Sequence, residues 1–460
     1  MADGNKEPVA LSSDERIEGL VRLWSEIKYN FAFFDRLPNL DWEKVLTEYL
    51  PLVRKEQSNQ EYFRLLTRCV AQLHDGHTMV IQMIPDEGVR FAVPLYPENA
   101  PPLLVHPVEG KAVIMELGET EEIHRAGLRR GMEVTHVDGR PVREVLENDL
   151  YPYLFASTPQ ARDAWAYPVL LNGPRGTKVS LRVRDLNSTA RTVTLTREPL
   201  DAKFAMALPK PILGTMVALM SGPQGQKLPW ERRPKREPRE LPDGIMYVPL
   251  DSFVSYEIVK RFDALFERIS RARGLIIDVR ENGGGNTSIA YAIIGYLIDR
   301  PLTGSRWKTR QHLPSESASG KKDGWYKGGP WTVQPVEDKK PFLGPVVVLI
   351  GPGTFSAAED FLIMLHSSHR ATLVGQRTGG STGQPLIISL PGGYMASICT
   401  KWDTYPDGRE FVGVGVIPDV EVYPTQAEIA AGLWSGGKDP ILEKGLEVLR
   451  AQLRKGPDGG

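Results

Sequence analysis

The chain has 460 residues, of which 41% are apolar and 25% charged, as in soluble globular proteins, and its length predicts roughly two to four domains. A net charge of -1 gives no support for binding to nucleic acid or to an anionic membrane surface, and no apolar run is long enough to span a membrane. Two cysteines, Cys69 and Cys399, indicate neither a disulfide framework nor a zinc site.

The N-terminal stretch MADGNKEPVALSSDERIEGL lacks the charged and then apolar pattern of a secretory signal. The compartment therefore stays open between the cytoplasm and, if a signal has been removed, the periplasm or the exterior. The composition also leaves the oligomeric state open.

Residues 12–73 carry apolar side chains at helical spacing and begin with the helix-start residues Ser13, Asp14 and Glu15. Two further segments, DWEKVLTEYLPLVRK and NQEYFRLLTRCVAQL, repeat the pattern and lead to the turn LHDGHT. We predict an N-terminal helical domain over residues 1–90.

Short strands and turns follow from about residue 92 to residue 200. The stretch AGLRRGMEVTHVDGRPV contains an Asp-Gly hairpin turn, and GPRGTKVSLRVRD with ARTVTLTRE reads as a second hairpin. This order of glycines and strands resembles a PDZ domain of the bacterial protease type, and we assign residues 91–205 to it. Such modules bind an extended peptide at a sheet edge.

Residues 222–243 are rich in proline and charge and predict a solvated linker. Strands and helices then alternate, which predicts an α/β core over residues 206–430 with crossover connections. A final amphipathic helix falls within residues 431–460.

The loop RENGGGNTS follows a buried strand and precedes a helix. Its glycines allow backbone N–H groups to approach a ligand closely. A phosphate cradle is one interpretation, but no Lys-Ser/Thr pair follows. An oxyanion hole that uses the N–H group of Gly283 or Gly284 fits better.

Ser356 follows the strand PVVVLI and precedes a helix, between small neighbours. A serine there is either an ordinary helix N-cap or a nucleophile whose hydroxyl stands beside oriented N–H groups. On the second interpretation, the N–H of Ala357 is another oxyanion donor.

A serine needs a base, and imidazole is the usual one. Of eight histidines, His77 lies in a glycine-containing turn just after a predicted helix, where a structural role is the alternative. The spacing of His74 and His77 would also suit a metal, but no third ligand stands out, and we expect neither metal nor cofactor.

Taken in order, LHDGHT, the PDZ-like module, LIIDVRENGGGN, VLIGPGTFSAAEDF, ATLVGQRTGG and GVGVIPDVEV resemble the C-terminal-processing (tail-specific) serine peptidase family, which includes the tricorn protease core. The resemblance implies a crotonase- or Clp-protease-like α/β core. One branch uses a lysine base about two dozen residues after the serine, where this chain has Gly380 or Ser381. The other branch, tricorn-like, uses an N-terminal histidine, so the resemblance implies Ser356 as nucleophile and His77 as base.

The resemblance also implies an acid that orients the base, and this residue is matched less directly to the family's pattern. The tricorn-like branch has a glutamate three residues before the Gly-Val/Ile-x-Pro-Asp motif, but Val412 stands there and Glu410 lies two residues earlier. We expect Glu410 to be the acid. Asp403, Asp407, a water molecule or a backbone group are alternatives, and Glu359 is expected to brace the glycine loop instead.

The resemblance implies a serine peptidase that hydrolyses polypeptides by acyl transfer, with the PDZ-like domain holding or gating the substrate. Two alternatives remain. The same groups suffice for an esterase or other acyl hydrolase, because esters are easier to cleave than amides. A non-catalytic binding module, as in the retinoid-binding relatives, is the other.

Overall fold

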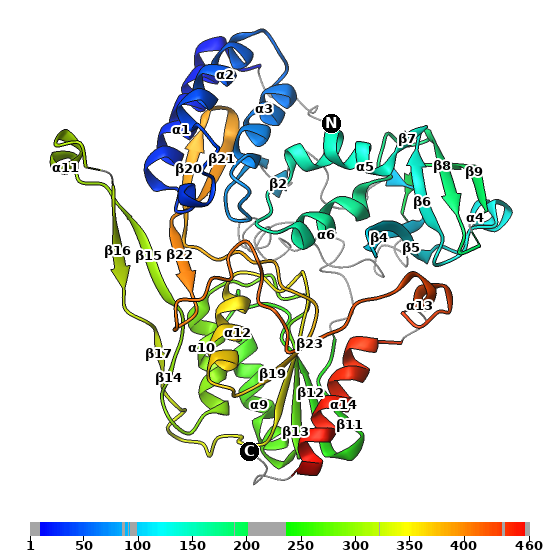
Figure 1. Cartoon of the computed structure of the whole chain (residues 1–460), viewed down its shortest axis with the longest axis vertical. Coiled ribbons are helices and arrows are strands. Elements are labelled where there is room, and N and C mark those ends of the chain that lie inside the picture. Colours follow the sequence, from blue (N-terminus) through cyan, green and yellow to red (C-terminus); the bar gives the residue numbers. More distant parts are fainter. Residues whose placement is uncertain are drawn as a thin grey trace, which may run out of the picture.

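The computed structural model describes residues 10–84, 88–90, 92, 99–187, 189–200, 236–321, 323–434 and 438–455. Residues 222–235 of the predicted linker lie outside these ranges. The fold mixes helices and sheets. Figure 1 shows the N-terminal helices and a β-rich unit at one end of the molecule and a helix-covered central sheet at the other.

The three predicted N-terminal helices are confirmed as α1 (Ser13–Asn30), α2 (Trp42–Arg54) and α3 (Asn59–Ala71). Two of them start with a capping box, in which the side chains of Ser12 and Ser58 pair with a glutamate three residues later. Their inner faces bury apolar side chains in the largest core of the protein.

A four-stranded antiparallel sheet joins these helices to the distant C-terminal half. Its order is β2 (Gly88–Arg90), β1 (Met79–Ile84), β21 (Tyr394–Cys399) and β20 (Pro385–Leu390). The register pairs Met79 with Ser397. The turn that carries His77 is therefore anchored at its end by strand pairing across more than 300 residues of sequence.

A second sheet forms the β-rich unit. Along it lie β4 (Leu103–Val108), β5 (Lys111–Leu117), β6 (Glu133–Val137), β8 (Lys178–Arg184) and β9 (Ala190–Thr196), and β7 (Arg140–Pro141) pairs with β6. The predicted Asp-Gly turn between β6 and β7 is confirmed, with positive φ at Asp138 and Gly139. The unit carries α4 (Glu121–Ala126), α5 (Val142–Val145) and α6 (Pro159–Val169), and α6 packs on β4 at the sheet edge.

The central sheet has the order β11 (Arg239–Leu241), β12 (Ile245–Pro249), β13 (Gly274–Asp278), β18 (Val346–Ile350), β19 (Thr372–Gly375) and β23 (Val420–Glu421). All pairs except β11–β12 are parallel. Strands β12, β13 and β18 are buried throughout and read as continuous apolar runs, as expected for a sheet covered on both faces.

Alternate residues of these strands face two different helical layers. One face packs on α9 (Glu257–Arg271), α10 (Thr287–Ile294) and α12 (Ala357–Ser367). The other face packs on α14 (Pro440–Lys455), where Ile441 and Leu449 share a core with Ile276 and Val347. The loops after β13, β18 and β19 leave the same edge, where parallel sheets commonly form their sites.

The remaining elements are short. They are β3 (Asn99–Ala100) paired with β10 (Glu198–Pro199), β14 (Leu302–Thr303) paired with β17 (Thr332–Val333), β15 (Arg306–Gln311) between β16 (Gly324–Gly328) and β22 (Lys401–Thr404), α11 (Pro314–Ala318), α13 (Gln426–Ala430), and helical turns at Phe34–Arg36, Leu146–Leu150, Tyr151–Tyr153, Pro242–Gly244, Gly295–Leu297 and Pro391–Gly393. Among the helices that the structure describes, none is both long and apolar enough to cross a membrane.

Candidate active site

Ser356 occupies a sharp turn between β18 and α12. Its backbone has φ 58° and ψ -126°, a conformation that costs a residue with a Cβ atom free energy and is concentrated at functional sites. The loop after β13 packs directly behind it, because a Cβ atom on Gly284 would lie 2.7 Å from Ser356 Cβ. This is the geometry of a strand-to-helix corner that exposes one hydroxyl.

The structure brings His77 to this hydroxyl. The distance from His77 Nε2 to Ser356 Oγ is 3.0 Å, although the two residues are 279 positions apart. The imidazole is stacked on Phe355, with ring centroids 4.8 Å apart, and the backbone carbonyl of His77 accepts a hydrogen bond of 2.7 Å from Ser397. His77 as a residue is only 4% exposed, so packing sets the orientation of its ring.

The other imidazole nitrogen contacts a second serine. His77 Nδ1 lies 2.8 Å from Ser381 Oγ, and that hydroxyl donates over 3.4 Å to the buried carboxylate of Asp75. Thr78 and Ser157 donate to the same carboxylate over 2.7 Å and 3.3 Å.

These donors assign the histidine tautomer. The Asp75 carboxylate accepts hydrogen bonds, so the hydroxyl of Ser381 donates its proton toward Asp75 and accepts from Nδ1–H. The lone pair is then on Nε2 of His77, facing Ser356. The chain of donors leaves the imidazole oriented to accept a proton from the Ser356 hydroxyl.

Glu410 is not brought to the imidazole, contrary to the sequence-based expectation. Its carboxylate accepts a hydrogen bond of 2.6 Å from the indole of Trp402, while Nδ1 of His77 contacts Ser381. The physical reason is the register of β22, which holds Trp402 beside the loop that carries Glu410. Of the two aspartates weighed beside it, Asp403 pairs with Lys401 and Asp407 with Arg409.

The predicted oxyanion donors differ in whether their N–H group already has a hydrogen-bond acceptor. The N–H of Gly284 donates over 2.9 Å to the side chain of Asn282, whose own amide donates to the carbonyl of Leu250. Within the described residues, the N–H groups of Gly283 and Ala357 have no acceptor. Of the predicted oxyanion donors, these two N–H groups are therefore the ones that have no acceptor among the described residues.

Glu359 braces the loop that carries Ser381. Its buried carboxylate accepts from the N–H groups of Gly380, Ser381 and Ser356 over 2.8, 2.9 and 3.2 Å, and from the hydroxyl of Thr378. Burial raises the pKa of Glu359 to about 8, although these donors oppose the rise. Glu359 therefore links the turn at Ser356 to the loop of Ser381, whose hydroxyl contacts His77.

Burial also controls the charge of the base. Burial, together with the smaller effect of the nearby charge of Lys401, lowers the pKa of His77 to about 3. The imidazole is therefore neutral at physiological pH, which is the form that accepts a proton. Burial raises the pKa of Asp75, opposed by its hydrogen-bond donors.

Sequence reasoning missed two residues of this cluster, Ser381 and Asp75. A signal was present for each. Ser381 stands where the other branch of the resembled family has its lysine base, and Asp75 is part of the turn that carries His77. In the described part of the chain, no group of three or more His, Cys, Asp or Glu side chains is placed to hold a metal ion.

Comparisons with known proteins indicate the family of two parts of this chain. Residues 244–422 match the family model of peptidase family S41, and residues 14–71 match that of the tricorn protease C1 domain. A tricorn protease homolog of Streptomyces coelicolor is 24% identical over 437 residues, which are 91% of this chain and 31% of the relative. The carboxyl-terminal-processing peptidase 3 (chloroplastic) of Arabidopsis thaliana is 22% identical over 414 residues, 87% of this chain and 68% of the relative.

The chain thus spans about a third of the first of these relatives and about two thirds of the second. Among solved structures, mature CPAF matches with a TM-score of 0.69 and 18% identity, covering 97% of this chain and 98% of that one. Identity at this level shows a shared fold. From the two matched family models, residues 244–422 form a peptidase family S41 domain, and the N-terminal helices, within residues 14–71, form a tricorn protease C1 domain.

Proposed function

We propose that the protein is a serine peptidase that hydrolyses peptide bonds by acyl transfer, with Ser356 as the nucleophile and His77 as its base. One observation carries this proposal: the 3.0 Å contact between Ser356 Oγ and His77 Nε2 at a strained strand-to-helix turn. The family and the names of the relatives support the same reaction class.

In the first step, Nε2 of His77 takes the hydroxyl proton while Ser356 Oγ bonds to the substrate carbonyl carbon. The carbonyl oxygen becomes negatively charged and is stabilised by the N–H groups of Gly283 and Ala357. The imidazolium then gives its proton to the leaving amine. Water, deprotonated by the same imidazole, releases the acyl group and restores Ser356.

Asp75, acting through Ser381, takes the orienting role that we expected for Glu410. When the imidazole becomes positively charged, its Nδ1–H donates to Ser381, whose hydroxyl is polarised by the Asp75 carboxylate. Asp75 and Ser381 are positioning residues, because they act on the substrate only through His77.

Residues 91–205 are proposed to be a PDZ-like domain that holds or gates the polypeptide, between an N-terminal domain over residues 1–90 and a crotonase- or Clp-protease-like core over residues 206–430. Its helix α6 supports a coupling to the site: Thr158 donates over 3.0 Å to the carbonyl of Gly379, and Gln160 donates over 3.0 Å to that of Thr378. A peptide added at β4, beside α6, would lie next to the loop that carries Ser381.

The test is labelling of the full chain with a fluorophosphonate probe, followed by peptide mapping. We expect labelling at Ser356 that is lost in Ser356→Ala, strongly reduced in His77→Ala, and unchanged in the control Ser270→Ala, an exposed serine on α9. Turnover of a peptide and of a p-nitrophenyl ester then separates a peptidase from an esterase. A folded protein that neither labels nor cleaves peptide would contradict the proposal and favour a binding module.

A further inference from the structure

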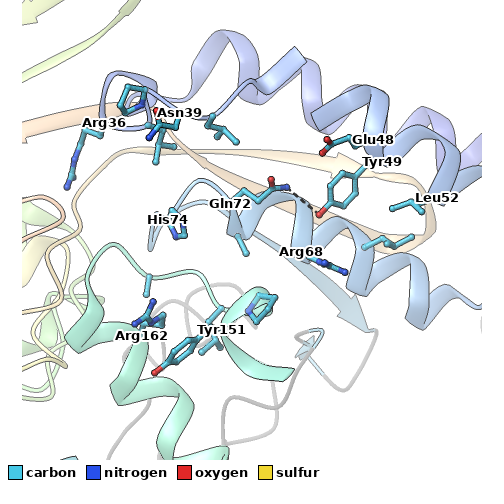
Figure 2. Close-up of a pocket in the computed structure, with 18 residues that line it drawn as sticks. Arg36, Asn39, Glu48, Tyr49, Leu52, Arg68, Gln72, His74, Tyr151 and Arg162 are labelled. Atoms are coloured by element: carbon cyan, nitrogen blue, oxygen red, sulfur yellow. Dashed lines mark hydrogen bonds between the residues drawn. The ribbon is translucent and has the colours of Figure 1, made fainter. Parts of the chain in front are cut away.

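The turn that carries His77 is contacted by a segment of the β-rich unit. Figure 2 shows His74, at the start of this turn, across a cavity from Tyr151 and Arg162 of that unit. Ser157 lies between these two residues in the sequence, just before α6. The turn and the segment are remote in sequence, so their contacts depend on how the β-rich unit packs against the N-terminal helices.

The hydroxyl of Ser157 makes two hydrogen bonds to this turn. It accepts from the backbone N–H of Gly76 over 2.9 Å and donates to the carboxylate of Asp75 over 3.3 Å. The directions are fixed, because an N–H group only donates and a carboxylate only accepts. One side chain therefore holds both the carboxylate and the backbone of the residue before His77.

The two carboxylate oxygens of Asp75 have different donors. Oδ2 accepts from the N–H of His77 over 3.2 Å and from the hydroxyl of Thr78 over 2.7 Å, and both donors are close neighbours in the chain. Oδ1 accepts from Ser157 over 3.3 Å and from Ser381 over 3.4 Å. Ser157 thus holds the same oxygen that polarises the hydroxyl beside the imidazole.

Burial makes the charge of Asp75 depend on these donors. The residue is only 2% exposed, so protein groups replace the water that would otherwise solvate its carboxylate. Burial raises the pKa of Asp75, and the hydrogen bonds from Thr78, the His77 backbone, Ser157 and Ser381 oppose the rise. The loss of one donor therefore favours the protonated acid, which stabilises a positively charged imidazole less than a carboxylate does.

Other ionisable groups act on this turn from neighbouring elements. Arg36, at the end of the helical turn after α1, interacts electrostatically with Asp75, and Lys401 of β22 interacts with His77. Cys399 of β21 is also near Asp75, and burial raises the pKa of this thiol, which leaves it uncharged. Both cations remain in every variant described below, so a change in pH dependence reports the hydroxyl that was removed.

We infer that Ser157 is a positioning residue of the same reaction, which holds the Asp75 carboxylate and the backbone beside His77. It acts on Ser356 only through these groups. The inference rests on the proposed function, because it adds a member to the same set of hydrogen bonds. That set then takes one side chain from the N-terminal turn, one from the β-rich unit and one, Ser381, from the core.

The experiment follows the full chain over a range of pH in two assays. The rate at which a small fluorophosphonate labels Ser356 reports activation of the serine without any peptide binding. Steady-state kinetics on one peptide then separates kcat from KM. The variants are Ser157→Ala, which removes the hydroxyl, and Ser157→Thr, which keeps one, and thermal unfolding shows whether each is folded.

Two controls separate positioning from support of the fold. Gln160→Ala removes hydrogen bonds of 3.0 Å and 2.8 Å from α6 to two backbone carbonyls of the core, and it leaves the donors of Asp75 in place. Thr194→Ala changes an exposed residue on β9 of the same unit. A loosened β-rich unit would affect Gln160→Ala as well, whereas Ser157→Ala alone removes a donor from the carboxylate.

We expect Ser157→Ala to lower the labelling rate and kcat about tenfold on the acid side of the profile, with KM within about twofold of wild type. The acid limb should move up by about one pH unit, because a tenfold change corresponds to one pKa unit, and the loss should shrink at higher pH. Ser157→Thr should restore most of the activity. Gln160→Ala should keep the acid limb of wild type, and Thr194→Ala should match wild type at every pH.

Two results would overturn the inference. One is a Ser157→Ala variant as active as wild type at every pH. The other is a loss of the same size at every pH, as for a residue that only supports the fold. Failure of the proposed function is a separate outcome, because wild type would then neither label at Ser356 nor cleave peptide.

Discussion

Replacing Ser381 by alanine tests which group orients His77, the proposed base. The change removes the hydroxyl that lies 2.8 Å from His77 Nδ1 and leaves this buried N–H without its acceptor. A hydrogen bond to a charged group contributes about 1.5–3 kcal/mol, and it is strongest when the imidazolium forms in the transition state. At 1.36 kcal/mol per factor of ten, kcat should fall roughly 10- to 150-fold with little change in KM.

The matched variant is Glu410→Gln. The glutamine oxygen still accepts a hydrogen bond from the indole of Trp402, so kcat should stay within about threefold of wild type, as for a substitution away from the reacting groups. Steady-state kinetics on one peptide, with thermal unfolding to confirm that each variant is folded, gives both values. The reasoning is refuted if Glu410→Gln lowers kcat a hundredfold while Ser381→Ala leaves it unchanged.

Three further predictions concern the same site. Ser356→Gly should abolish cleavage but raise the free energy of unfolding, by about 1 kcal/mol in urea titration, because glycine relieves the strain of φ 58°; unchanged or lower stability would contradict this. Gly284→Ala should lower the free energy of unfolding by at least about 2 kcal/mol and abolish cleavage, because Gly284 has φ 91° and the new Cβ atom would lie 2.6 Å from the carbonyl oxygen of Phe355. A stable variant that still cleaves peptide would show that the loop can move. Because the pKa of His77 is lowered to about 3 in the folded protein, the unfolded chain takes up this proton at a higher pH than the folded chain. The free energy of unfolding should therefore fall as the pH drops from about 6.5 toward 3, and it should fall less in His77→Gln. Equal dependence of the unfolding free energy on pH in the two proteins would argue against a neutral buried imidazole.

Local patterns in the sequence determined much of the fold. The capping serines Ser12 and Ser58 mark where α1 and α3 begin, since a cap depends on residues only a few positions apart. The alternation of strands and helices after residue 244 predicted an α/β core with crossover connections in the same way. The corner at Ser356 and the glycine loop behind it were also visible, because strand, turn and helix are contiguous there.

The pairing of Ser356 with His77 was anticipated from the family resemblance, and the assignment of the acid from the same source was not matched by the contacts. Glu410 was chosen by its distance from a sequence motif, whereas its actual partner is set by the position of Trp402. Spacing along the chain does not determine which side chain reaches an imidazole when the candidates lie on different strands and loops.

Only the tertiary structure decided the hydrogen bonds around His77 and the lining of the cavity between the N-terminal helices and the segment that leads into α6 (Figure 2). Ser381 and His77 are 304 residues apart and meet because β1 pairs with β21 while Glu359 holds the loop of Ser381. Arg68 and Arg162 face one cavity because α6 packs near the turn after α3. The sequence by itself determined the elements, whose causes are local, and the tertiary structure determined the partners, because strand register and helix packing are set by contacts between distant segments.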